Sequence, residues 1–341
     1  MKEILEIPYG VDLHAHCRDF GQSHKETLKT AADAAAAGGV CFVGDMPNNS
    51  ELTDSKEKIL IKKEKVEGLK VDFGFYLGTL GDEKQNFKEC YDEVLGLKVY
   101  MSETTGGFTV TDKDKLDHIF KSWDCEKPIL VHSEDNTLKT AIELAEKYDR
   151  ILYVCHVSLK SEIDLIKNAK DKRPGKVFAE VTPHHLFLDS SQSGNPFKQM
   201  KPPLVDEYNQ RALWIAINDG TIDTIGSDHA PHTIEEKTSA NPPFGVPGLE
   251  TTLQLLLKAE RYKMIRRKKI IELTHSNPIK IFGIKEEENS FVEIDQSSSM
   301  ILRGKNLETK CKWTPFEGMK MQDIIVRTTK NGEIIYNNKN L

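Results

Sequence analysis

The sequence predicts a (β/α)8 TIM barrel, an α/β fold, that carries a small C-terminal β appendage. Three observations favour this fold class: eight short apolar runs of strand type, amphipathic stretches of helical type between them, and a tail of alternating polarity. Eight β-then-α units within about 250 residues are typical of a closed barrel rather than an open sheet. The chain has 341 residues, which is long enough for one such domain.

The predicted strands are apolar nearly throughout, as expected for parallel strands that are buried on both faces. They cover residues 10–14, 40–44, 71–77, 96–101, 129–132, 152–156, 177–182 and 222–227. Amphipathic stretches between them predict helices at residues 25–37, 55–69, 136–148 and 209–218. We expect the first of these helices to open with the capping box Ser23-His24-Lys25-Glu26.

The pattern changes near the C-terminus. From about residue 290 apolar and polar residues alternate, which is typical of half-exposed strands. Asn331-Gly332 lies between two such segments and is a strong signal for a β-hairpin turn. We therefore expect a barrel domain of residues 10–289 and a small β appendage of residues 290–341, joined by residues 1–9 and packed on the barrel.

The amino-acid composition argues against several classes of binding partner. The 47 basic and 53 acidic side chains give a net charge of −6, which argues against nucleic acid or an anionic membrane surface. No apolar run approaches the roughly 20 residues of a membrane span. The six cysteines show no CxxC pairs, which favours buried thiols in a reducing cytosol over a disulfide framework. We expect a cytoplasmic protein that acts on a small molecule.

Histidine and aspartate fall at the ends of predicted strands, where TIM barrels build their active sites. His14 and His16 end the first strand, and alternation places both imidazoles on one face, an arrangement that suits Zn²⁺. His132, His156 and Asp228 follow at the ends of strands five, six and eight. One such histidine is more often structural, but four histidines and an aspartate at four strand ends indicate a metal site.

Lys98 lies inside an apolar strand, where an ammonium group is costly to bury. Burial favours the neutral amine, which can take up CO2 and form a carbamate. The two oxygens of that carbamate can bridge two metal ions. The alternatives are a lysine that extends from the strand end to solvent, or one that pairs with a carboxylate.

Several segments resemble the dihydroorotase family of the amidohydrolase superfamily. They are Asp12-Leu13-His14-Ala15-His16-Cys17-Arg18-Asp19, Met46-Pro47-Asn48, Gly96-Leu97-Lys98, Ser227-Asp228-His229-Ala230-Pro231-His232, Val246-Pro247-Gly248-Leu249-Glu250-Thr251 and Trp313-Thr314-Pro315-Phe316-Glu317-Gly318. The likeness is greatest to the dihydroorotase domain of the animal multifunctional pyrimidine-synthesis protein. It implies a hydrolase that interconverts L-dihydroorotate and N-carbamoyl-L-aspartate in pyrimidine (UMP) biosynthesis.

The resemblance also implies a set of metal ligands. By position it assigns two zinc ions, the first to His14, His16, Lys98 and Asp228, and the second to Lys98, His132 and His156, with a carboxylated Lys98 as the bridge. A hydroxide between the ions would attack the ring carbonyl, with Asp228 as the group that moves the proton.

Cys155 and Glu180 are of zinc-ligating types, so a third ion is an alternative. The simpler interpretations are a buried thiol that points away from the side chain of His156, and a carboxylate that orients a ligand. For the pair His184 and His185, after strand seven, we expect a surface position or one behind the ligands.

Substrate recognition should depend on Arg18, two residues beyond His16, because a guanidinium group can hold a carboxylate bidentately. The resemblance adds Asn48 and His232 to this carboxylate site. Alternatively, Asn48 is only a turn residue and His232 only a surface loop residue. Thr104 matches a threonine of the family. It lies in a loop, residues 102–108, that could close over the substrate. The alternative is an ordinary solvent loop.

Two rival functions stay open. Dihydropyrimidinases and allantoinases share the metal ligands but need no cation for a ring carboxylate, so Arg18 with Asn48 argues against them. A non-catalytic homologue that serves as a scaffold for aspartate transcarbamoylase would lack metal ligands, and none is missing here. A homodimer and an association with aspartate transcarbamoylase are both compatible with the sequence.

Overall fold

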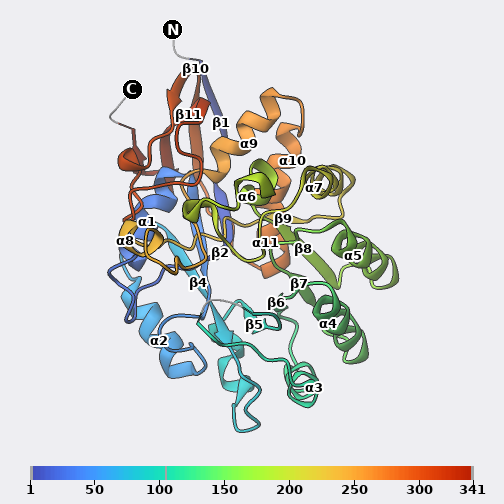
Figure 1. Cartoon of the computed structure of the whole chain (residues 1–341). Coiled ribbons are helices and arrows are strands. Elements are labelled where there is room, and N and C mark those ends of the chain that lie inside the picture. The colour runs from blue at the N-terminus through green and yellow to red at the C-terminus, as the bar shows by residue number, and fades with distance from the viewer. Residues whose placement is uncertain (1–2, 104–105, 339–341) are drawn as a thin grey trace.

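The fold is described here from a computed structural model, which describes residues 3–103 and 106–338. Eight parallel strands follow one another in chain order around a barrel (Figure 1). They are β2 (Gly10–Ala15), β3 (Val40–Asp45), β4 (Asp72–Gly78), β5 (Gly96–Tyr100), β6 (Ile129–His132), β7 (Leu152–Val154), β8 (Val177–Val181) and β9 (Thr224–Ile225). A parallel bridge between Ala15 and His229 closes the ring just beyond β9. The predicted fold class and its eight strands are confirmed.

Helices cover the outside of the barrel (Figure 1). They are α1 (Leu28–Ala37), α2 (Lys56–Lys65), α3 (Lys113–Ser122), α4 (Asn136–Lys147), α5 (Lys160–Lys172), α6 (Pro183–Phe187), α7 (Glu207–Asp219), α8 (Ile234–Lys237), α9 (Thr252–Arg261), α10 (Arg267–Ile271) and α11 (Asn277–Phe282). The four helices expected from the sequence correspond to α1, α2, α4 and α7. Within the described part of the chain, no helix has the length and apolarity needed to cross a membrane.

The start of α1 differs from the prediction. The helix begins at Leu28, and Thr27 caps it: the Thr27 hydroxyl accepts from Thr30 N at 3.1 Å, and the Thr30 hydroxyl accepts from Thr27 N at 2.9 Å. The capping box predicted at residues 23–26 is therefore wrong. Glu26 is fully buried and is occupied by other partners, among them Thr309 in the tail.

A second sheet joins the two ends of the chain. Its antiparallel order is β1-β10-β11-β12, formed by β1 (Ile4–Pro8), β10 (Phe291–Ile301), β11 (Lys320–Lys330) and β12 (Glu333–Asn337). In Figure 1 the blue β1 runs beside the red β10 and β11. Asn331 and Gly332 connect β11 to β12 with φ angles of 50° and 79°, as the hairpin signal predicted.

Two hydrophobic clusters hold these parts together. The larger one contains barrel strands and the helices around them, and includes fully buried side chains such as Val43, Leu97 and Leu130. The second cluster joins the tail to loops beside the barrel. Its members are Leu188, Met200, Leu204, Val246, Leu255, Leu302, Leu307, Cys311, Trp313, Phe316, Met321 and Ile324. The C-terminal tail therefore packs against the loops that follow strands β8 and β9.

Candidate active site

The two histidines at the end of β2 face the same carboxylate. His14 Nε2 lies 3.4 Å and His16 Nε2 lies 3.0 Å from Oδ1 of Asp228, which follows β9. The ring centroids of His14 and His16 are 5.4 Å apart. Alternation along the strand therefore brings both imidazoles together, as the sequence predicted.

Asp228 is held ionised by its surroundings. Burial alone would raise the pKa of its carboxyl, but the neighbouring His14 and His16 lower that pKa well below its usual value. The backbone of Asp228 is left-handed, with φ at 45°, a conformation that aspartate tolerates better than most residues. Strand β9 ends at Ile225, so Asp228 stands in the turn that follows the strand.

Glu180, on β8, fixes the orientation of His14. Its Oε1 lies 2.7 Å from His14 Nδ1, and its Oε2 accepts from the Tyr153 hydroxyl at 2.9 Å. Burial would lower the pKa of His14, but Glu180 and Asp228 raise it well above its usual value. Because Glu180 binds Nδ1, His14 directs its Nε2 toward Asp228. Metal-binding histidines are commonly oriented in this way, by a carboxylate on the nitrogen that does not bind the metal.

His132 and His156 form a second pair on the next two strand ends. His132 Nδ1 and His156 Nε2 are 2.8 Å apart, and both rings are buried. Burial and neighbouring cationic groups lower the pKa of His132 to about 3 and that of His156 well below its usual value, so both are neutral. Among the described residues, His132 Nε2 and His156 Nδ1 have no hydrogen-bond partner.

Lys98 is buried between these groups, at 1% exposure, so it does not extend to solvent. Its Nζ donates to Cys155 Sγ at 3.0 Å and lies 5.2 Å from the centre of the Tyr100 ring. Within the described part of the chain, no carboxylate lies at ion-pair distance from Lys98. Neither alternative for this lysine, a solvent-exposed ammonium or a carboxylate pair, is what the structure contains.

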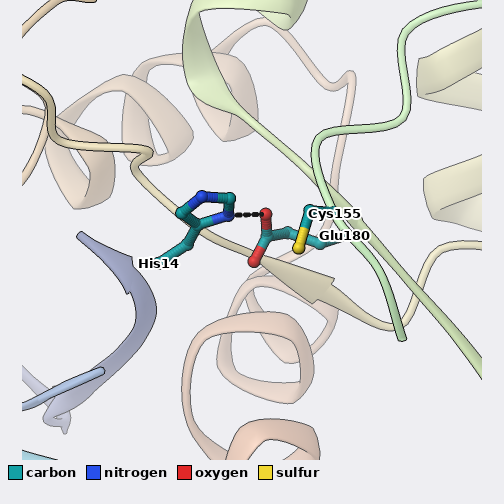
Figure 2. A group of neighbouring side chains, drawn as sticks. All are labelled: His14, Cys155 and Glu180. Atoms are coloured by element: carbon teal, nitrogen blue, oxygen red, sulfur yellow. Dashed lines mark hydrogen bonds and ion pairs between the residues drawn. The ribbon is translucent and has the colours of Figure 1, made fainter. Parts of the chain in front are cut away.

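Cys155 belongs to the same cluster, contrary to expectation. Ligand atoms of His14, Cys155 and Glu180 lie within 4.8 Å of one another, and Figure 2 shows the Cys155 sulfur beside the Glu180 carboxylate. The predicted opposite direction of Cys155 and His156 is wrong because β7 ends at Val154 and His156 is left-handed, with φ at 38°. Strand alternation no longer applies at these two residues.

The donor set fits metal ions. Imidazole nitrogens, carboxylate oxygens and a cysteine sulfur are the atom types that Zn²⁺ binds. Two groups of three such ligands are each tight enough for one ion: His14 with His16 and Asp228, and His14 with Cys155 and Glu180. Buried nitrogens without partners are rare in proteins, so the free nitrogens of His132 and His156 also fit a role as metal ligands.

A small pocket opens beside the cluster. Its lining residues are His16, Arg18, Asn48, Lys201, Asp228, Ala230, Phe244 and Gly245. Arg18 is buried and left-handed, with φ at 62°. Its Nε donates to Pro231 O at 3.1 Å, and its Nη2 lies 3.0 Å from His232 Nε2. Arg18 therefore reaches the pocket through a turn, since β2 ends at Ala15, and not through strand alternation.

Asn48 and His232 flank this arginine. Asn48 Oδ1 lies 2.7 Å from His16 Nδ1, so the amide orients a cluster histidine as well as lining the pocket. His232 is fully buried, which excludes the surface-loop alternative. Burial and the cations Arg18 and Lys25 lower the pKa of His232 to about 2, so its ring is neutral.

Comparison with known proteins shows the family. Residues 4–152 match the family model described as Dihydro-orotase-like. A dihydroorotase of Pyrococcus furiosus is 33% identical over 354 residues, which covers 96% of this chain and 81% of that protein. The chain belongs to the dihydroorotase family. The resemblance predicted from the motifs is confirmed.

Other relatives extend the comparison. The multifunctional protein CAD of Squalus acanthias is 36% identical over 338 residues, but the chain spans only 15% of that protein's length. Among solved structures, the L-hydantoinase (dihydropyrimidinase) from Arthrobacter aurescens superposes with a TM-score of 0.90 at 23% identity, covering 98% of this chain and 86% of that one. At this identity the likeness concerns the fold alone, so the choice between dihydroorotase and dihydropyrimidinase chemistry depends on the pocket.

Lys201 is a pocket residue of this dihydroorotase family member that sequence reasoning missed. Its Nζ lies 4.7 Å from the centre of the Phe244 ring and 3.2 Å from Glu103 Oε2. It lies in the connection between α6 and α7, where no strand end marks it as a candidate. Thr104, the other substrate contact expected from the sequence, lies outside the described residues.

The pair after β8 is not on the surface of this dihydroorotase fold. His184 and His185 are both buried, with ring centroids 4.5 Å apart. His185 contacts the Thr182 hydroxyl at 2.7 Å and Pro202 O at 3.1 Å. Of the two positions expected for this pair, the surface one is excluded, and His185 holds the loop that carries Lys201.

Proposed function

We propose that the chain hydrolyses the cyclic amide of L-dihydroorotate to N-carbamoyl-L-aspartate, and catalyses the reverse ring closure, in pyrimidine biosynthesis. The observation that carries this proposal is one pocket in which Arg18 and Asp228 both line the wall. Arg18 offers a cation for the ring carboxylate of the substrate, and Asp228 stands among the metal-type side chains. Identity of 33% with the Pyrococcus furiosus dihydroorotase supports the same activity.

The cluster residues would hold two zinc ions. We assign His14, His16 and Asp228 to one ion, His132 and His156 to the other, and a carboxylated Lys98 to both. Cys155 and Glu180, with His14, would hold a third ion if one binds. When bound, the ions would lower the pKa of a water molecule and polarise the ring carbonyl of the substrate.

Asp228 moves the proton in this account. The carboxylate, ionised by its histidine neighbours, accepts a proton from the attacking water as a C–O bond forms. The amide C–N bond of the ring then breaks, and the same proton passes to the ring N–H, which leaves as the terminal NH2 of the ureido group. In ring closure the protonated Asp228 returns this proton to the departing water, so one group serves both directions.

Arg18 determines the substrate class. Its Nε and Nη2 are engaged by Pro231 and His232, while its Nη1 has no hydrogen bond among the described residues. Binding the substrate carboxylate would use Nη1 and the donors beside it, with Asn48 and His232 as further contacts. A dihydropyrimidinase substrate offers no anion to this buried guanidinium group, which would then stay unpaired.

Turnover in both directions tests the proposal. Metal-loaded protein should open L-dihydroorotate and close N-carbamoyl-L-aspartate, and a chelator should abolish both reactions. The proposal would be refuted if both activities survived metal removal. It would also be refuted if fully metallated protein showed neither activity. The second result would favour a non-catalytic scaffold, for which the complete ligand set gives no support.

The wider setting belongs to the same proposal. We assign the site to a barrel of residues 10–289 and treat residues 1–9 and 290–341 as the appendage. We also propose a cytoplasmic location, a homodimer and an association with aspartate transcarbamoylase; what supports the association is the match to a multifunctional protein of which this chain spans 15%. Light scattering of the chain alone, and with an added transcarbamoylase, tests the last two.

A further inference from the structure

The tail motif that begins with Trp313 contacts the loop that carries Asp228 and His232. Trp313 is buried, at 6% exposure, and its indole Nε1 donates to the backbone oxygen of His232 at 2.7 Å. Its ring system also packs against Phe197 in a T-shaped contact, with centroids 5.0 Å apart. The motif thus comes from the C-terminal tail, 81 residues from its partner, yet binds directly behind a pocket residue.

His232 transmits this contact into the pocket. Its Nε2 lies 3.0 Å from Arg18 Nη2 and 2.9 Å from Phe244 O. Phe244 and Arg18 both line the pocket. A shift of the His232 backbone would therefore move the ring that contacts Arg18, because Trp313 holds the backbone oxygen of the residue whose ring lies against Arg18.

Lys237 reinforces the same wall. It is fully buried, and its Nζ lies 5.6 Å from the centre of the Trp313 ring. The ammonium group donates to Pro243 O at 2.8 Å, to Gly245 O at 3.2 Å and to Gln199 O at 3.4 Å. These carbonyls belong to the segments on either side of Phe244 and next to Lys201, so Lys237 ties both segments to the tail.

Glu26 anchors the tail just before Trp313. Its Oε2 accepts from the Thr309 hydroxyl at 2.9 Å and from Lys310 N at 3.2 Å, and lies 3.5 Å from His229 Nε2. The ring of His229 is oriented by the amide groups of Gly248 and Leu249, which point at its Nδ1. A buried carboxylate therefore joins the tail to the residue that follows Asp228.

We propose that Trp313 is a positioning residue for the carboxylate subsite, and that the tail segment from Thr309 to Trp313 sets the place of His232 and, through it, of Arg18. The identity of the bound carboxylate rests on the proposed function. The positioning of His232 by Trp313 does not, because it concerns contacts within this chain.

The test compares Trp313→Phe with Trp123→Phe. Trp123 is an equally suitable position for the control, since it is fully buried and its Nε1 also donates to a backbone oxygen, that of Lys127, at 2.9 Å. It caps the end of α3, across the barrel from the C-terminal sheet (Figure 1). Each phenylalanine keeps an aromatic ring and removes one N–H donor, so the two variants lose the same kind of hydrogen bond.

We expect Trp313→Phe to raise the KM for L-dihydroorotate by about two- to tenfold, the effect of one lost hydrogen bond, with kcat and bound metal nearly unchanged. Hydrogen exchange should quicken at residues 229–233 and 243–246. Trp123→Phe should lower the melting temperature to a similar extent, and leave both KM and exchange in those segments as in the wild type.

Two results would overturn the proposal. One is unchanged exchange at residues 229–233 in Trp313→Phe; the other is an equal rise of KM in both variants, which would mean general destabilisation. If the wild-type protein turned over no dihydroorotate, the proposed function would fail, but the exchange measurement would still decide whether Trp313 positions His232.

Discussion

Glu180 Oε1 lies 2.7 Å from His14 Nδ1, and both side chains are buried, with exposed fractions of 0% and 1%. This pair leaves only Nε2 of His14 to face Asp228, so the imidazole is oriented before any ion arrives. The same carboxylate also accepts from His156 N and from the Tyr153 hydroxyl, at 3.2 Å and 2.9 Å. One buried carboxylate on β8 thus joins the ends of β2 and β7 by hydrogen bonds.

Glu180→Gln should weaken metal binding. The amide keeps the size of the side chain but loses the charge that holds His14, and partners of this kind are typically worth about 10–100-fold in metal affinity. Competition with a calibrated chelator measures the change. Glu162→Gln is the matched control, because Glu162 is also buried but accepts from Ser158 N and Leu159 N outside the cluster. Equal affinity in Glu180→Gln and wild type would remove Glu180 from the account.

Metal content provides a second prediction. We expect about two zinc ions per chain in active protein. A third ion, if Cys155 and Glu180 bind one, should be lost in Cys155→Ala while the other two stay, since the cysteine belongs to only one of the two tight ligand groups. Elemental analysis of the purified variants measures both numbers. Active protein with less than one ion per chain would contradict a two-ion site.

Lys98 should carry a carbamate. Protein exchanged into ¹³C-bicarbonate is expected to show one carbamate resonance, which Lys98→Ala should lose along with bound metal and activity. Lys237→Met is the control for the resonance and the bound metal, both of which it should keep, because Lys237 is also a buried lysine and donates to the backbone oxygen of Pro243 outside the cluster. Retention of the resonance in Lys98→Ala, or its absence in metal-loaded wild type, would show that Lys98 binds in another form.

Asp228→Asn should abolish proton transfer while keeping the shape of the side chain. General acid–base groups contribute typically about 10²–10⁴-fold, so kcat should fall by at least that factor in ring opening and in ring closure alike. Steady-state assays in both directions, on samples with measured metal content, give the comparison. Near-normal turnover in either direction would mean that another group carries the proton.

The strand-end residues were predictable because they follow a local rule. In a barrel the carboxyl ends of all strands meet on one face, so His14, His132 and Asp228 could be grouped from their positions alone. Side-chain alternation then correctly placed His14 beside His16. These arguments need only the residues within each strand.

The failures have physical causes that no local pattern contains. Cys155 points into the cluster because the left-handed backbone of His156 interrupts alternation. The predicted start of α1 was wrong because Glu26 does not cap the helix. Its carboxylate accepts a hydrogen bond from Thr309, 283 residues away in the tail. Lys201 lies in a loop whose path is set by tertiary contacts such as that of His185 with Pro202. In each case a long-range contact or backbone turn decided the outcome.

Arg18 carries the claim about substrate class. Dihydroorotate differs from dihydrouracil by one ring carboxylate, and charge-assisted hydrogen bonds to it contribute about 1.5–3 kcal/mol each. Without that carboxylate, the buried guanidinium would lack its partner. Arg18→Lys keeps the charge but loses the fork, so it should retain an intermediate preference, whereas Arg18→Ala should lose nearly all of it.

The most direct test is therefore the ratio of kcat/KM for L-dihydroorotate to that for dihydrouracil, measured on wild type and Arg18→Ala at equal metal content. The account predicts a wild-type ratio of about a thousandfold or more, and a collapse of that ratio in Arg18→Ala through loss of dihydroorotate turnover. Wild-type protein that hydrolyses dihydrouracil as well as dihydroorotate would contradict it and would assign the chain a dihydropyrimidinase activity instead.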